Sequence, residues 1–287
     1  MIMIKVSIIM PTFQNARYIG RAIKSVLSQT YKNFELIIID NYSKDNTEEI
    51  VESFNDSRII YEKFSNEGII SKSRNKGISL SNGEYIAFLD SDDWWQKDKL
   101  FLCLDALDDS VEIIYHKMKV IRHSNYFNLS SVGRAPKFKS LNHSLLRQGN
   151  IIPNSSVVIS RSAFKNIGYL SEDIKKVTWE DFDYWLKLTS ITNKFKFINR
   201  PLGYYWIGNE NNTNPQRTLS NVENMKQILF LDDNQNLPSW LMYQKAVSLY
   251  QLDQPAESLR YLKYVFRNGD DPQLRLKALA RIIRYSF

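Results

Sequence analysis

The chain has 287 residues, 43% of them hydrophobic and 24% charged, which is typical of globular proteins and excludes an intrinsically disordered chain. Its formal net charge of +7 fits an anionic small ligand, an acidic membrane surface or nucleic acid, without choosing between them. The single cysteine, Cys103, excludes an internal disulfide. With no signal-peptide pattern and no uncharged apolar run of ~18 residues, we expect a cytoplasmic protein that can still touch a membrane.

The first hundred residues alternate between short apolar runs and segments of helical periodicity. We expect strands over 5–10, 34–40, 58–64 and 85–89, with helices over 18–27, 47–54 and 71–80. Asn46 and Glu49 resemble a capping box at the start of the second helix. The alternating order predicts an α/β fold with a mostly parallel, doubly wound sheet, and such sheets bind ligands beyond the carboxyl ends of their strands.

The second half is less regular and ends in helices. We expect strands over 112–121, 155–160 and 194–207, and helices over 141–148, 162–167, 180–188, 221–231, 240–252, 256–267 and 273–285. The segment 208–218 is rich in asparagine and is a candidate flexible lid. The last helix is basic and amphipathic, so it would either lie on a membrane surface or pack against the protein with a solvated basic face. Its basic residues are Arg275, Lys277, Arg281 and Arg284.

Three carboxylates follow the fourth expected strand within four positions, at Asp90, Asp92 and Asp93. Carboxylates this close repel one another unless a proton or cation lies among them, and hard oxygen ligands favour Mg²⁺ or Mn²⁺. A solvated acidic turn would have the same sequence, so the cluster alone does not decide. The chain has neither a Gly-x-Gly-x-x-Gly nor a P-loop motif, which leaves a metal on these acids as the candidate for holding phosphate.

Several ordered segments together resemble a family 2 glycosyltransferase. The resemblance is strong over residues 4–100 and extends to about 213, and it rests on 6–15, 22–30, 34–40, 66–68, 73–77 and 83–93. It implies a GT-A fold, a nucleotide-sugar donor that is UDP-linked, inversion at the anomeric carbon, and Mn²⁺ or Mg²⁺ as the metal.

The resemblance also implies residues that bind the donor. Asp40 would accept a hydrogen bond from the N3–H of a uracil-like base, and Pro11, Thr12 and Asn15 would line the base and ribose. Arg74 would contact the base or a phosphate. Each of these residues also has an ordinary use in a turn, a helix cap or a solvated helix face.

The acidic turn would hold the diphosphate end of the donor. Asp90 would contact the ribose or a metal-bound water, Ser91 counts among the donor-binding residues, and Asp92 would ligate the metal that bridges the diphosphate, with Asp90 as a second metal residue. Family members often carry a Tyr-Arg-x-His pattern where this chain has 205–208, ending in Gly208. The missing histidine leaves the third metal ligand open.

A second acidic pair, Glu180 and Asp181, resembles the Glu-Asp motif at the start of a helix in this family. The match implies that Asp181 is the general base that deprotonates the acceptor hydroxyl, with Glu180 positioning it or the acceptor. Such a base typically contributes about 10²–10⁴-fold to the rate. Acids at a helix N-terminus also complement the helix dipole, and without the upstream motifs that use would be favoured.

The expected organisation is a GT-A domain over 1–218, with a nucleotide-binding half (1–100) and an acceptor half (101–218), and a helical extension over 219–287. The expected acceptor is a saccharide linked to a lipid such as undecaprenyl diphosphate. The reaction would belong to surface polysaccharide or O-antigen synthesis at the inner face of the membrane. We expect no nucleic-acid partner. Two alternatives stay open, a nucleotidyltransferase acting on sugar phosphates and a catalytically degenerate sugar-binding or scaffold protein. The first would need a glycine-rich basic loop after the first strand, and the acidic residues argue against the second.

Overall fold

The computed structural model describes residues 5–108, 110–122, 130–177, 179–208, 214–229, 237–269 and 271–285. By its internal contacts the chain divides into two compact units. Unit 1 comprises Met1–Ala135 and Ile151–Asn209, and unit 2 comprises Pro136–Asn150 and Glu210–Phe287. The functional domains predicted from the sequence, with a boundary after residue 218, stay a prediction.

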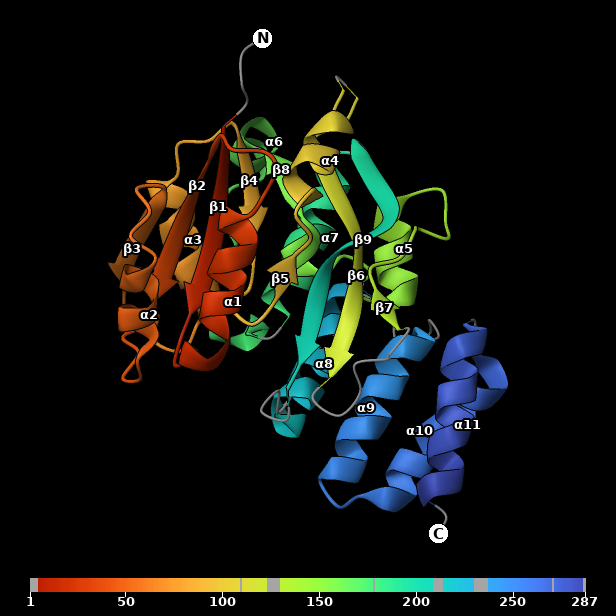
Figure 1. Ribbon diagram of the computed structural model, residues 1–287. Helices are drawn as coiled ribbons and strands as arrows, with labels where there is room; N and C mark the ends of the chain where they lie inside the picture. Colours follow the sequence, from red (N-terminus) through yellow and green to blue (C-terminus); the bar gives the residue numbers. More distant parts are fainter. Residues whose placement is uncertain are drawn as a thin grey trace. The chain divides into compact units, whose positions relative to one another are not determined.

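A mixed sheet forms the centre of unit 1 (Figure 1). Its strands are β1 (Val6–Thr12), β2 (Phe34–Asp40), β3 (Ile59–Lys63), β4 (Tyr85–Phe88), β5 (Trp94–Trp95), β6 (Ile113–Arg122), β7 (Ser131–Val132), β8 (Val158–Ser160) and β9 (Phe195–Ile207). The order is β3-β2-β1-β4-β8-β6-β9-β5, with β7 paired to β6. Strands β1 to β4 run parallel, as predicted, whereas β8 is antiparallel to both of its neighbours. The predicted α/β class is therefore confirmed.

Helices cover both faces of the parallel strands (Figure 1). Unit 1 contains α1 (Ala16–Leu27), α2 (Thr47–Ser53), α3 (Ile70–Leu80), α4 (Lys99–Asp105), α6 (Arg161–Ile167), α7 (Glu180–Ile191) and the 3-10 turns η1 (Asn154–Ser156) and η2 (Ile174–Lys176). Helices α1 and α2 bury apolar residues against one face of β1 and β2. On the other face, a Cβ added to Gly77 of α3 would lie 2.7 Å from Ile9 Cγ2. Glycine therefore lets α3 approach the sheet closely.

The carboxyl ends of β1, β2 and β4 meet at one edge of the sheet. Thr12 lies opposite Asp40, and the Leu89 N–H donates to the Ile9 carbonyl at 3.0 Å. The first strand was predicted over 5–10, and β1 continues two residues further, to Thr12. Successive residues of β1 direct their backbone hydrogen bonds in turn to β2 and to β4, and Pro11 is on the side of β4. The pairing with β4 ends at Ile9, so the N–H that proline lacks is not needed there.

The helix over Thr47–Ser53 is not capped as the sequence suggests. Asn46 makes no side-chain capping bond. Instead Asp45 Oδ1 accepts from the Thr47 backbone N–H, and Asp45 Oδ2 accepts from the Ala16 N–H at 2.9 Å. One carboxylate therefore binds the N-terminal ends of both α1 and α2 beside the sheet edge.

Unit 2 is helical, as predicted for the end of the chain. Its helices are α5 (Leu141–Gln148), α8 (Pro215–Leu229), α9 (Ser239–Gln251), α10 (Pro255–Asn268) and α11 (Pro272–Tyr285). The last three pack around a small apolar core. The candidate lid at 208–218 was predicted as a loop, which is wrong from Pro215 onward, and its residues 209–213 lie outside the described part of the chain. Within the described residues, no helix combines the length and the apolar character needed to cross a membrane.

Candidate active site

The acidic turn after β4 holds three carboxyls in three different environments. Asp93 is buried, and its Oδ1 accepts from the Trp206 backbone N–H at 2.8 Å. Burial, followed by the charges of Asp92 and Asp90, raises the pKa of Asp93 well above its ordinary value. Asp93 is thus a structural residue, while Asp90 and Asp92 are only half-buried.

Asp92 carries negative charge that a cation would relieve. Burial, followed by the charge of Asp90, raises the pKa of Asp92 to about 6. Arg21 opposes this shift and its Nη2 donates to the Asp92 carbonyl at 2.8 Å. Mg²⁺ typically binds one or two carboxylates and substrate phosphates, so this turn fits a divalent ion. No group of three or more His, Cys, Asp or Glu side chains among the described residues could hold the ion without help from the donor.

The buried guanidinium of Arg74 joins the turn after β4 to the start of α7. Its Nη2 donates to Asp90 Oδ1 at 2.8 Å, and its Nη1 donates to Glu180 Oε1 at 2.7 Å. Only 4% of the Arg74 side chain is exposed. The predicted contact of Arg74 with a base or phosphate stays a prediction, and both of these nitrogens already have carboxylate partners.

The acidic pair at the start of α7 shares this cluster. Glu180 is buried and its Oε2 has no hydrogen-bond partner among the described residues. Burial and the charge of Glu180 raise the pKa of Asp181 to about 7, against the opposing effect of Arg74. A general base works best with a pKa near the operating pH, so Asp181 has the property that the predicted role requires. Asp183 lies apart from this cluster, with its Oδ1 2.9 Å from Lys176 Nζ.

The predicted base-binding residues line the ends of β1 and β2. Asp40 is fully buried, with Oδ1 accepting from Ser43 and Oδ2 accepting from the Tyr61 hydroxyl at 2.6 Å. A donor base could reach Asp40 only if Tyr61 or Ser43 moved. Pro11 is buried beside it, and the buried Thr12 hydroxyl has no partner among the described residues.

Two further predicted residues bridge the donor side of the site. Asn15 Nδ2 donates to Ser91 Oγ at 2.6 Å, which ties the start of α1 to the acidic turn. Both residues therefore lie within the edge formed by β1 and β4, and their contacts with a donor stay predictions.

Several site residues escaped sequence reasoning. Asn154 Nδ2 donates to Asp90 Oδ1 at 3.2 Å, and Ser155 Oγ accepts from the Asp90 N–H at 3.0 Å. Both lie in η1, where the sequence predicted a strand from Ser155. The run Pro-Asn-Ser-Ser at 153–156, rich in turn formers, was the available signal.

Arg21 gave no signal, because it is one of several basic residues on a helix. Burial, followed by the charges of nearby aspartates, raises the pKa of the Tyr205 hydroxyl. These aspartates belong to the acidic turn after β4 and to the start of α7, so Tyr205 lies near both.

Comparison with known proteins identifies the fold and the family. The family described as "Glycosyl transferase family 2" matches residues 7–168. WfaP of Escherichia coli, a UDP-Glc:alpha-D-GlcNAc-diphosphoundecaprenol beta-1,3-glucosyltransferase, is 31% identical over 207 residues, which cover 70% of this chain and 77% of WfaP. A fragment of S. aureus TarS in complex with UDP-GlcNAc has a TM-score of 0.61 at 20% identity, covering 98% of this chain and 81% of that one. The mannosyltransferase PcManGT from Pyrobaculum calidifontis, in complex with GDP-Man and Mn²⁺, has a TM-score of 0.61 at 14% identity, again covering 98% and 81%.

The two structural likenesses concern the fold alone and confirm the GT-A architecture that the sequence resemblance implies. The sequence match covers more than half of the chain, from the first strand of the sheet to the end of α6. The predicted family is therefore confirmed, and this chain belongs to glycosyl transferase family 2.

Proposed function

We propose that this protein transfers a sugar from a UDP-linked donor to a saccharide acceptor carried on a lipid diphosphate, with inversion at the anomeric carbon. The observation that carries the proposal is the Arg74 bridge. It links Asp90, on the predicted donor side, to Glu180, next to the predicted base. WfaP is named for a UDP-glucose donor and a diphosphoundecaprenol acceptor, and TarS has been solved with UDP-GlcNAc, which favours this donor and acceptor class.

In the proposed reaction, Asp181 takes the proton from the acceptor hydroxyl as the oxygen forms a bond to the anomeric carbon. The bond between that carbon and the diphosphate oxygen breaks, and UDP leaves with the electron pair. Asp92, with Asp90 beside it, would hold Mg²⁺ or Mn²⁺, which when bound neutralises charge on the departing diphosphate. The charge of Glu180 raises the pKa of Asp181, and the charge of Arg74 lowers it.

The setting of the reaction follows from the acceptor class. A lipid-linked saccharide would be presented at a membrane, so we place the protein in the cytoplasm, peripherally at the inner face of the cell membrane. The product would contribute to a surface polysaccharide such as an O-antigen. AmsB of Erwinia amylovora, named for amylovoran biosynthesis, is 27% identical over 212 residues and favours the same kind of pathway.

The test is a donor panel against the purified full chain, with a synthetic lipid-diphosphate GlcNAc as acceptor and release of nucleoside diphosphate as the readout. We expect acceptor-dependent release of UDP that EDTA abolishes and Mn²⁺ or Mg²⁺ restores. Asp181→Asn should abolish transfer, while Asp183→Asn is the matched control on the same helix and should retain it. Release of pyrophosphate from a nucleoside triphosphate would instead identify a nucleotidyltransferase, and no release from any donor would count against catalysis.

A further inference from the structure

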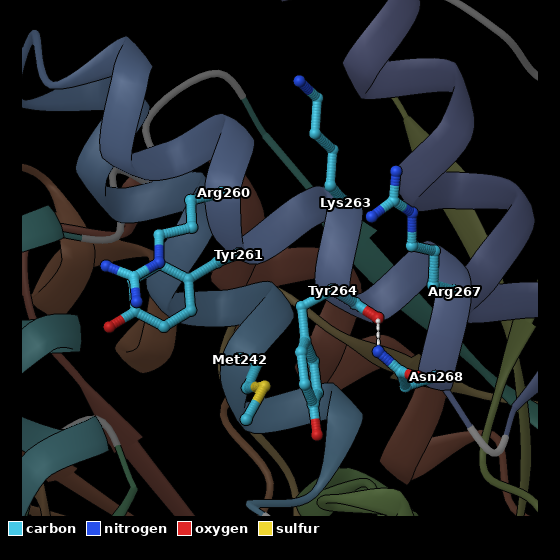
Figure 2. Close-up of a pocket in the computed structure, with 7 residues that line it drawn as sticks. All are labelled: Met242, Arg260, Tyr261, Lys263, Tyr264, Arg267 and Asn268. Carbon is cyan, nitrogen blue, oxygen red and sulfur yellow. Dashed lines mark hydrogen bonds between the residues drawn. The ribbon is translucent and has the colours of Figure 1, made fainter.

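A basic groove lies on unit 2, far along the chain from the acidic residues, with a volume of about 420 Å³ (Figure 2). It is formed by α10 and by Met242 of α9. The side chains that matter here are Met242, Arg260, Tyr261, Lys263, Tyr264 and Arg267. The groove thus combines three cationic side chains with two tyrosines, whose rings have an apolar body and a polar tip.

The three cations of the groove occupy one face of α10. Arg260, Lys263 and Arg267 follow each other at helical spacing and are exposed, whereas Leu262 and Val265 are buried in the core of unit 2. None of the three forms an ion pair within the residues that the structure describes. Their positive charge is therefore available to an external anionic partner.

We propose that the basic groove docks unit 2 onto the anionic surface of a lipid bilayer. Basic side chains near such a surface are attracted by its negative potential, and tyrosine rings are enriched at the level of the headgroups. The bilayer presents its lipid phosphate groups in a plane. A row of cations on one face of α10 matches that arrangement. This proposal names the surface by which the protein would reach the membrane-bound acceptor of the proposed function. It rests on that function for its biological purpose only.

The neighbouring helix α11 favours a bilayer over a soluble anion. Leu276 is 66% exposed and Ile283 is 54% exposed, so this helix offers apolar side chains that a free phosphate would not need. The sequence of α11 has four basic residues and no acidic one.

The membrane contact predicted from the sequence was assigned to this last helix alone. However, Arg275 Nε donates to the Phe266 carbonyl at 2.8 Å, and Arg281 Nε donates to the Tyr243 hydroxyl at 2.7 Å. Two of its four cations are therefore held by bonds inside unit 2, although their charge remains. The three cations of the groove form no ion pair among the described residues, so we assign the principal contact to α10.

The experiment is sedimentation of the full chain with vesicles of phosphatidylcholine alone or mixed with phosphatidylglycerol. The test variant reverses the groove, Arg260→Glu with Lys263→Glu and Arg267→Glu. The matched control reverses three exposed cations of unit 1, Lys97→Glu with Lys165→Glu and Arg200→Glu, so both variants have the same net charge. Far-UV circular dichroism and the melting temperature check that each variant folds, and Arg260→Gln with Lys263→Gln and Arg267→Gln is the milder substitute.

We expect the wild type and the unit 1 control to bind the anionic vesicles and not the neutral ones. The groove variant should lose roughly a hundredfold in apparent partitioning, because each cation contributes near an anionic surface. Equal loss in both triple variants would show a mere net-charge effect and overturn the proposal, as would no vesicle binding by the wild type. Displacement by pyrophosphate beyond that of sodium chloride at equal ionic strength would reveal a soluble-anion site and also overturn it. Transfer to a water-soluble acceptor should be unchanged in the groove variant, so the docking proposal and the proposed activity can fail separately.

Discussion

Arg74 Nη1 lies 2.7 Å from Glu180 Oε1, although 106 positions separate the two residues in the chain. Because the same guanidinium also binds Asp90, it fixes the turn after β4 against the first turn of α7. Removal of one partner from a buried ion pair leaves an uncompensated charge and is strongly destabilising. The pair therefore joins the stability of unit 1 to the geometry of the candidate site.

We expect Arg74→Met to lower the free energy of unfolding by about 3–5 kcal/mol, measured by urea denaturation. Two carboxylates, on Asp90 and Glu180, would lose their shared counter-charge. Adding Glu180→Gln to that variant should restore part of the loss. The control is Lys72→Met on the same helix, where the partner Glu67 is exposed and the loss should be much smaller. An Arg74→Met variant as stable as the control would contradict a structural role for the bridge.

The pKa of Asp181, raised to about 7, predicts a pH dependence of kcat/KM. Asp181 must be deprotonated to act as a base, and a raised pKa means that it holds its proton at acidic pH. The rate should therefore rise about tenfold per pH unit on the acid side and level off above about pH 7. Glu180→Gln removes a like charge beside Asp181, so it should move this limb to lower pH. If the rise of kcat/KM on the acid side occurred at the same pH in Glu180→Gln as in the wild type, the titrating group would not be Asp181.

The sequence was sufficient to predict those features that depend on residues close together in the chain. Apolar runs, two of which end in an aspartate, predicted β1, β2 and β4 and the edge where they meet. The short elements β5 and α4 were missed, because a two-residue strand has no period and α4 is apolar on more than one side, with Phe101 exposed and Cys103 buried. The partners of a side chain were out of reach. Nothing local to Asp40 indicates that Tyr61 lies on its Oδ2, and nothing local to Asp93 distinguishes it from Asp92.

Substitutions at Asp92 and Asp181 should separate donor binding from chemistry. Asp92→Ala should weaken Mn²⁺-dependent binding of UDP, measured by calorimetry, because it removes the principal predicted metal ligand. Asp181→Ala should leave that binding nearly intact and abolish transfer. Protons compete with the metal for Asp92, whose pKa is raised to about 6, so wild-type binding should weaken below about pH 6. Equal UDP binding by Asp92→Ala and wild type in Mn²⁺ would refute the assignment.

The Asp40 hypothesis predicts opposite effects of two conservative variants on the KM for the donor. Tyr61→Phe removes the hydroxyl that donates to Asp40 Oδ2 at 2.6 Å, so it should open this oxygen to a base and lower the KM. It should also cost about 1–3 kcal/mol of stability, since a buried acceptor loses its partner. Asp40→Asn should raise the KM. Tyr169→Phe, at an exposed tyrosine, is the control, and an unchanged KM in both test variants would make Asp40 a structural residue only.

A buried lysine beside the site predicts a second pH effect, on stability. Lys99 is fully buried, its Nζ has no hydrogen-bond partner among the described residues, and it lies 3.8 Å from the centroid of the Trp95 ring. Burial lowers the pKa of Lys99 to about 8. The unfolded chain holds this proton up to about pH 10.4, so between the two values it binds more protons than the folded chain. The contribution of Lys99 to stability should therefore rise with pH across that interval, by up to about 3 kcal/mol. Burial raises the pKa of the neighbouring Cys103 to about 11, so above about pH 8.5 the thiol contributes in the opposite direction.

Lys99→Met should be at least as stable as the wild type at neutral pH, because an apolar side chain of similar volume replaces a buried cation. Relative to the wild type, its free energy of unfolding should lack the contribution of Lys99 between about pH 8 and 10.4, since the titrating group is gone. Lys97→Met, at an exposed position two residues earlier, should keep the wild-type profile. Urea denaturation across this interval measures all three proteins. A Lys99→Met variant with the same pH profile as the wild type would show that Lys99 does not titrate in this interval, and a large loss of stability would mean that the contact of Lys99 with Trp95 outweighs its desolvation.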